Sequence, residues 1–211
     1  MTVTESTVEP EVRRVVRARV PSGERREQYL EVAADLAVRE GVAAVNMDAV
    51  AVGTGVNKAL LYRQFSNRGE ILSALFERET TALDEGILRA IGSAEGFEPQ
   101  LRAWVGAWFD FIATRGTLLG RLMDARTVSE EVAPRHGRRV REIVELYGAW
   151  YAREFRLDVE VGRDAAAMLF AALGGVVDRW SASPTAATRR RLEAGYVDTV
   201  LGTLGRLASA D

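Results

Sequence analysis

The sequence predicts an all-α protein of about nine helices, and three observations support this prediction. Apolar residues recur every three or four positions over long stretches, the spacing that places them on one face of a helix. Alternating runs of β-branched residues, which would indicate strands, do not persist. Asparagine or glycine stands at several positions where a helix is expected to begin or end. With 211 residues, 47% of them hydrophobic, the chain is long enough to bury a sizeable core.

The first four predicted helices are bounded by strong local signals. A helix at 25–40 ends at Gly41, and Asn46 caps a short helix at 47–52. The "GTG" stretch at 53–55 is a turn, after which Asn57 caps a helix of about seven residues at 58–64. Asn67 and Glu70 stand three residues apart, as in a capping box, and begin a long helix that extends to about residue 91.

The stretch "GSAEGFEP" at 92–99 is the clearest break in the chain. Beyond it the periodicity predicts helices at 99–114, 117–126, 129–155, 160–182 and 185–208. We therefore divide the chain into a flexible basic N-terminal arm at 1–22, a small helical domain at 23–70 and a larger helical domain at 71–211.

Composition excludes several classes of function. The absence of cysteine excludes a disulfide framework and a thiolate zinc site, and a single histidine leaves little basis for a histidine-activated nucleophile. With no paired carboxylates on facing helices either, we expect neither an enzyme nor a bound metal or cofactor. The polar start "MTVTESTVEP" is not a signal peptide, and no apolar run reaches the length of a membrane span. We expect a cytoplasmic protein.

The three short helices before residue 67 predict a helix-turn-helix, with the glycine-containing turn between the second and third helices. The third helix of such a unit lies in the major groove of double-stranded DNA, so polar groups at its N-terminal end reach base edges and phosphates. Leu61 and Phe65 share the opposite face and are expected to be buried. The predicted DNA-contacting residues are Asn46, Asn57, Lys58, Leu60, Tyr62, Arg63, Gln64 and Arg68. The basic stretch "RRVVRAR" at 13–19 lies ahead of this unit, where it could contact phosphates.

Residues 26–76 resemble the DNA-binding domain of the tetracycline-repressor (TetR) family of bacterial regulators. The resemblance is carried by "YLEVAADLAVREGVAAVNMDAVA" and by "GVNKALLYRQFSNRGEIL", which contains the Leu-Tyr-x-x-Phe signature at Leu61, Tyr62 and Phe65. Asn46 and Asn57 replace a frequent threonine and a frequent serine or threonine, and both residue types cap helices. "NRG" at 67–69 stands where Ser-Lys-Glu is typical, so Arg68 keeps the positive charge.

The resemblance implies an apolar cavity in the larger domain that binds a small-molecule effector. Aromatic residues recur at helical spacing there, which suits an apolar or aromatic molecule. The predicted ligand-binding residues are Trp104, Trp108, Phe111, Leu119, Met123, Tyr147, Tyr151 and Phe170.

The resemblance also implies a homodimer through the last two helices. We assign the dimer face to one apolar stripe on each helix, namely Leu169, Leu173, Val176 and Trp180, and Tyr196, Val200, Leu204 and Leu207. On the first of these helices Ala172, Gly174 and Gly175 are expected to allow close approach of a partner helix. Such a dimer presents two recognition helices roughly 34–36 Å apart and predicts a palindromic operator.

The sequence thus favours a transcriptional repressor that an effector releases from its operator. Two alternatives stay open. One is a DNA-binding regulator that needs no effector or that activates transcription. The other is a helical carrier of small molecules that has only the appearance of a helix-turn-helix. The sequence identifies neither the effector nor the operator.

Overall fold

The structure is a computed structural model that describes residues 22–115, 118–123 and 133–209. The predicted arm at 1–22 thus lies almost wholly outside the described residues. Within those residues the chain forms nine α-helices, one 3-10 turn and no strand, which confirms the predicted fold class. The elements are α1 Ser22–Arg39, η1 Val42–Ala44, α2 Met47–Thr54, α3 Lys58–Tyr62, α4 Arg68–Ile91, α5 Phe97–Arg115, α6 Leu118–Met123, α7 Ala133–Phe155, α8 Val159–Ser181 and α9 Ala186–Ala208.

Three asparagine caps begin the helices of the N-terminal domain as the sequence predicts. The side-chain Oδ1 of Asn46, Asn57 and Asn67 each accepts a hydrogen bond of 2.9 Å from a main-chain N–H in the first turn of α2, α3 and α4. Glu70 completes the start of α4, since its Oε2 accepts a hydrogen bond of 2.6 Å from the main-chain N–H of Ser66. These bonds satisfy donors that a helix start would otherwise leave unpaired.

The turn between α2 and α3 differs in length from the prediction. Helix α2 continues through Thr54, two residues further than expected, and Gly55 ends it in the left-handed conformation with φ of 65°. Glycine is suited to this position because it has no Cβ to strain a positive φ. Helix α3 is shorter than expected and ends at Tyr62. The turn η1 was not predicted.

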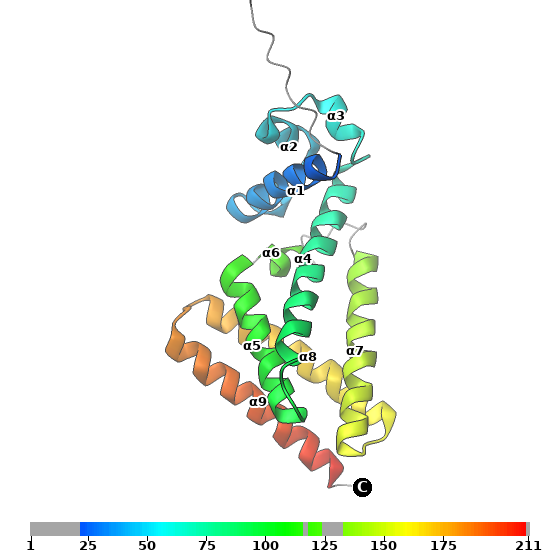
Figure 1. Cartoon of the computed structure of the whole chain (residues 1–211), viewed down its shortest axis with the longest axis vertical. Coiled ribbons are helices and arrows are strands. Elements are labelled where there is room, and N and C mark those ends of the chain that lie inside the picture. The colour runs from blue at the N-terminus through cyan, green and yellow to red at the C-terminus, as the bar shows by residue number, and fades with distance from the viewer. Residues whose placement is uncertain (1–21, 116–117, 124–132, 210–211) are drawn as a thin grey trace, which may run out of the picture.

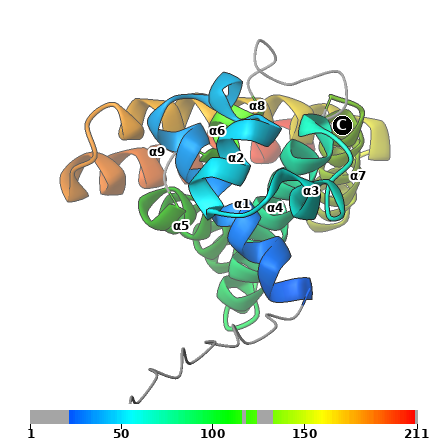
Figure 2. The same ribbon diagram turned by 90° about the horizontal axis from the view of Figure 1, so that it is seen from above.

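The N-terminal helices form a compact unit at one end of the molecule (Figure 1). Viewed from above, α1, α2 and α3 lie in front of the larger domain, and α4 leads from them into it (Figure 2). In the larger domain α4 packs against α5, α7 packs against α8, and α9 contacts both α5 and α8. None of the helices among the described residues is long and apolar enough to cross a membrane.

Helices α7 and α8 approach each other closely at two glycines. A Cβ added to Gly162 would lie 2.5 Å from the carbonyl oxygen of Gly148, and one added to Gly148 would lie 2.9 Å from the Cα of Arg163. Beside this contact Arg163 Nε donates a hydrogen bond of 2.8 Å to Glu145 Oε2. The absence of side chains at both glycines therefore sets the spacing of the two helices.

The apolar stripes assigned to the dimer face were largely misassigned. Most of their side chains are buried inside a single protomer, and those buried are Leu169, Leu173, Trp180, Tyr196, Val200 and Leu204. The same helices leave a different face exposed, which is rich in alanine and glycine. Periodicity identifies an apolar stripe but does not say whether it packs within the chain or against a partner.

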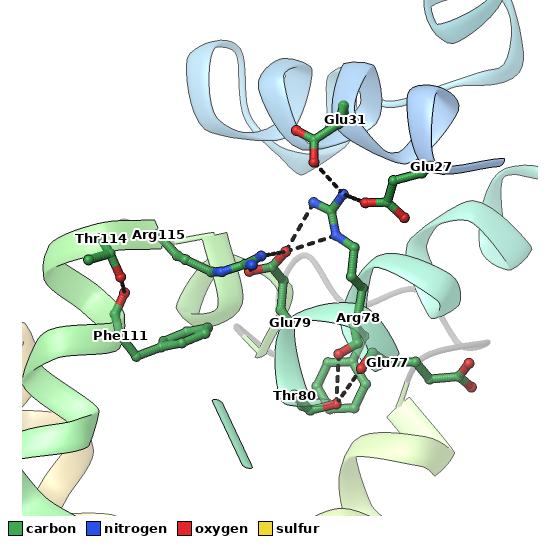
Figure 3. A network of polar contacts seen from close by, with 10 residues as sticks. Glu27, Glu31, Glu77, Arg78, Glu79, Thr80, Phe111, Thr114 and Arg115 are labelled. Carbon is green, nitrogen blue, oxygen red and sulfur yellow. Dashed lines mark hydrogen bonds and ion pairs between the residues drawn. The ribbon is translucent and has the colours of Figure 1, made fainter. Parts of the chain in front are cut away.

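A polar network joins the N-terminal domain to the larger domain (Figure 3). Arg78 on α4 contacts Glu27 and Glu31 on α1 through Nη1, at 2.7 Å and 2.9 Å. The next residue, Glu79, is buried and accepts hydrogen bonds from Arg78 and from Arg115 on α5. Two adjacent residues of α4 thus link α1 to α5.

Candidate DNA-binding surface and ligand cavity

Helix α3 places one face in solvent and the other in the core of the N-terminal domain. Leu61 and Phe65 are buried, and the ring of Phe65 packs at 6.4 Å between centroids against Tyr29 of α1. This anchoring holds the helix while its outer side chains stay accessible. Of the predicted DNA-contacting residues, Asn46, Asn57, Lys58, Tyr62 and Arg63 are exposed, whereas Leu60, Gln64 and Arg68 are half-buried.

Lys58 and Tyr62 form a cluster with Asp48 on this surface. The ammonium group of Lys58 pairs with the carboxylate of Asp48, and it lies 6.0 Å from the centroid of the Tyr62 ring. The hydrogen bond to Asp48 raises the pKa of Lys58, so the side chain carries its charge at neutral pH. Because both groups are exposed, the pair is weak and a phosphate can replace Asp48 as the partner of Lys58.

The side chain of Asn46 has a mainly structural role. Its Oδ1 caps α2, and its Nδ2 donates a hydrogen bond of 3.2 Å to the carbonyl oxygen of Ala44. Both ends of the carboxamide are therefore engaged within the protein. Asn57 differs, because the hydrogen bond to Ala59 uses only its Oδ1.

Arg68 makes contacts within the protein, and its predicted contact with DNA stays a prediction. Its guanidinium turns toward the protein, where Nε donates to the carbonyl oxygen of Val45 at 2.6 Å and Nη2 donates to that of Val42 at 2.9 Å. These carbonyls belong to the η1 turn and the residue after it, which local sequence signals did not reveal. Arg68 thus ties the start of α4 to the loop before α2 and positions the unit.

Two of the cavities in the larger domain adjoin each other. The outer cavity has a volume of about 720 Å³ and is lined by α5, α6, α7 and α8, mostly with apolar side chains. The inner one is much smaller, about 30 Å³, and lies between α4, α5, α6, α7 and α8. Four residues line both: Trp108, Leu119, Val140 and Phe170. The outer volume is in the range of cavities that hold small organic molecules.

Several polar side chains line the inner cavity. Arg139 on α7 pairs with Asp84 on α4, and both side chains line the cavity. The indole N–H of Trp104 donates to the hydroxyl of Tyr147. Burial raises the pKa of Tyr147 to about 12, so its hydroxyl stays protonated. Arg139 and Asp84 were not predicted as site residues, because isolated charges on helices usually face solvent.

The structure brings most of the predicted ligand-binding residues together. Trp104 and Tyr147 line the inner cavity, while Trp108, Leu119 and Phe170 line both cavities. Phe111 and Tyr151 line neither cavity, so these two assignments are corrected. Phe111 faces a different side of α5, and Tyr151 packs against Phe97 at 5.9 Å between ring centroids. The side chain of Met123 lies outside the described part of the chain.

Helix α6 connects the outer cavity to the N-terminal domain. Leu119, Gly120 and Arg121 line the cavity. Arg121 Nη1 also donates to the carbonyl oxygens of Ala37 and Val38, at 3.1 Å and 3.0 Å. These carbonyls lie in the last turn of α1, where a helix leaves acceptors unpaired and favours a positive charge. One short helix therefore contacts both the cavity and α1.

Comparison with known proteins agrees with the geometry of the N-terminal domain. Residues 30–75 match the family model of "Bacterial regulatory proteins, tetR family". The chain is also 38% identical over 94 residues to the HTH-type transcriptional activator FasR of Mycolicibacterium smegmatis. That match covers 44% of this chain and 43% of FasR, so it spans less than half of each protein.

Solved structures share the fold over most of the chain. A protein assigned as a transcriptional regulator from Pseudomonas aeruginosa PAO1 superposes with a TM-score of 0.75 at 20% identity, over 91% of this chain and 98% of that one. A TetR-like transcriptional regulator from Rhodococcus sp. RHA1 gives 0.67 at 22% identity, over 87% and 100%. Both of these proteins are described as transcriptional regulators. The resemblance is confirmed: residues 30–75 form a tetR-family domain, in a chain that has the fold of TetR-like regulators.

Proposed function

We propose that the chain is a DNA-binding transcriptional regulator that acts as a homodimer and responds to a small apolar or aromatic molecule. The observation that carries the proposal is the exposed end of α3, where Asn57, Lys58, Tyr62 and Arg63 surround a helix anchored by Leu61. We assign residues 23–70 to DNA binding and residues 71–211 to effector binding and dimerisation. Because its proposed partner is genomic DNA, we place the protein in the cytoplasm.

The proposed dimer face is the exposed side of α8 and α9. On α8 it consists of small side chains with one large apolar residue, Met168, which is 61% exposed. A Cβ added at Gly175 on α8 or at Gly195 on α9 would meet no atom within 4 Å in a single protomer. Small residues on paired helices allow a partner to approach closely. A two-fold dimer of this kind would place two α3 helices in successive major grooves of a palindromic operator.

The proposed effector site is the outer cavity. Its size and its apolar lining suit a small hydrophobic molecule. An effector there would contact α6, and Arg121 would carry a shift of α6 to the end of α1. Movement of α1 changes the placement of α3, so the two recognition helices would no longer match the operator.

We propose repression released by the effector as the sign of regulation, and activation as the second candidate. The name of the M. smegmatis relative, a transcriptional activator, favours that second candidate. Transcription of a reporter with and without the purified protein separates the two, since a repressor lowers and an activator raises the transcript level.

The proposal is tested by binding of the protein to the DNA upstream of its own gene, across a salt series. We expect the double variant Lys58→Ala, Tyr62→Ala to lose roughly 10- to 100-fold in affinity and to show a shallower salt dependence. Arg153→Ala, an exposed arginine in the last turn of α7, is the matched control and should bind like the wild type. Equal binding by the double variant and the wild type would contradict the proposed surface.

A further inference from the structure

Trp108 stands at the boundary between the two cavities. Its side chain lines both, and its ring lies 5.9 Å from the ring of Phe170, centroid to centroid, in an edge-to-face arrangement of 67°. Leu119 and Val140 complete this boundary. A molecule that fills the outer cavity and extends inward must therefore pass the indole of Trp108.

The indole N–H of Trp108 is buried without a hydrogen-bond acceptor among the described residues. Two other tryptophans of the same domain are satisfied: Trp104 donates to the hydroxyl of Tyr147, and Trp180 donates to the carbonyl oxygen of Thr185 at 3.3 Å. A buried donor without an acceptor is unfavourable, and such groups in folded proteins usually have a partner. Trp108 lines the cavities although its N–H is itself covered, so a bound molecule supplies that acceptor by displacing the atoms that cover the N–H.

The charges around the cavities indicate that this molecule is neutral where it meets Trp108. In the inner cavity Arg139 is neutralised by Asp84. Among the described residues that line the outer cavity there is one charge of each sign, Arg121 and Asp178, and Arg121 is hydrogen-bonded to α1. The remaining wall is predominantly apolar. A carboxylate at this depth would lose its hydration without gaining an unpaired cation, which is costly.

We propose that Trp108 is a specificity-determining residue, whose indole N–H binds a neutral acceptor such as a ketone, ester or amide carbonyl on an otherwise apolar effector. This inference rests on the proposed function, because it assigns the chemistry of the same effector site. The indole N–H would distinguish carbonyl-containing molecules from hydrocarbons of equal shape, a distinction that an apolar wall alone does not make.

The test compares two probes of nearly equal shape, benzophenone and diphenylmethane, which differ by one carbonyl oxygen. Binding to the full-length protein is measured for the wild type, for Trp108→Phe, which keeps an aromatic ring and removes the donor, and for Trp180→Phe as the control. Trp180 is buried on α8 and lines neither cavity. We expect Trp108→Phe to weaken benzophenone binding about tenfold and to change diphenylmethane binding less than twofold. Trp180→Phe should leave both affinities unchanged.

The ¹H–¹⁵N resonances of the tryptophan indoles give a second, site-specific readout. The resonance that is missing in Trp108→Phe should shift downfield when benzophenone binds to the wild type and stay near its position with diphenylmethane. A similar loss of affinity for both probes in Trp108→Phe, or an unmoved Trp108 resonance, would overturn the inference.

DNA binding is measured separately on the same samples, so the two proposals fail in different ways. If benzophenone binding depends on Trp108 but leaves operator affinity unchanged, the inference stands and regulation by this site is wrong. If neither probe binds while the protein still binds its operator, the assigned chemistry of Trp108 is overturned and the DNA-binding function stands.

Discussion

The carboxylate of Glu79 on α4 accepts hydrogen bonds from the guanidinium of Arg115 on α5, with Nη1 3.1 Å from Oε1 and 3.3 Å from Oε2 (Figure 3). Glu79 is 1% exposed. The same carboxylate contacts Arg78, which reaches the acidic residues of α1. The junction of the two domains therefore depends on one buried negative charge between two arginines.

Replacement of Glu79 by glutamine removes that charge and leaves the two guanidinium groups with weaker acceptors. We expect Glu79→Gln to lower the free energy of unfolding by about 1–3 kcal/mol, measured by urea denaturation. Glu77→Gln is the matched control, because Glu77 is on the same turn and its pair with Arg135 is largely exposed. A variant of Glu79 as stable as that of Glu77 would show that the junction does not need the charge.

Two arginines close in sequence should separate stability from DNA binding. Arg68→Ala leaves the carbonyls of Val42 and Val45 without their donor, so we expect a loss of about 1–3 kcal/mol in unfolding free energy. Arg63 is exposed just after α3, and Arg63→Ala should weaken DNA binding with little change in stability. Thermal melts and DNA titrations on both variants test this. Equal melting temperatures would contradict the structural role of Arg68.

Buried tyrosines predict a loss of stability at alkaline pH. Burial raises the pKa of Tyr147 to about 12 and shifts the pKa values of Tyr151 and Tyr196 upward as well. An unfolded tyrosine has a pKa of about 10, so above that pH the unfolded chain loses protons that the folded chain retains. The stabilisation is complete below pH 10 and is lost as pH rises through the folded pKa. Melting temperatures measured up to about pH 12 should fall less steeply in Tyr147→Phe.

The close contact of α7 and α8 predicts that a methyl group added at Gly162 lowers the stability of the protein. Gly162→Ala would place a Cβ against the carbonyl oxygen of Gly148, so we expect a loss of about 1–3 kcal/mol in unfolding free energy. Gly86→Ala on α4 is the control, because a Cβ there meets nothing within 4 Å. Alanine is the better helix former, so the control should be slightly stabilised, by up to about 1 kcal/mol. Similar stabilities for the two variants would argue against a tight contact.

The proposed dimer face can be tested by the introduction of one negative charge on α8. Ala172 is exposed on α8, and Ala172→Glu should shift the protein from dimer to monomer in light-scattering measurements on a sizing column. Two glutamates close to the dimer axis would repel each other and remain poorly solvated. Ala113→Glu, on an exposed position of α5, should leave the dimer intact. If Ala172→Glu remains dimeric, the dimer interface does not include this face of α8.

Local chemistry explains which parts of the fold could be predicted. The three asparagine caps and Gly55 act within a few residues of themselves, so the starts of α2, α3 and α4 follow from the sequence. The direction of Arg68 depends on carbonyls more than twenty residues away, in a turn with no strong signal. Helical periodicity likewise places Trp108 and Phe111 near each other on α5. It does not say that only Trp108 faces the cavity.

Helix α6 contributes Leu119 and Arg121 to the wall of the outer cavity, and Arg121 also contacts the end of α1. The cavity and the N-terminal domain are therefore linked through one short helix. If occupancy of the cavity changes the affinity for the operator, thermodynamic linkage requires the operator to change the affinity for the effector by the same factor. A molecule that weakens operator binding tenfold must bind the operator complex tenfold more weakly than the free protein. The number of operator copies relative to protein would then set the concentration of effector at which the regulated genes respond.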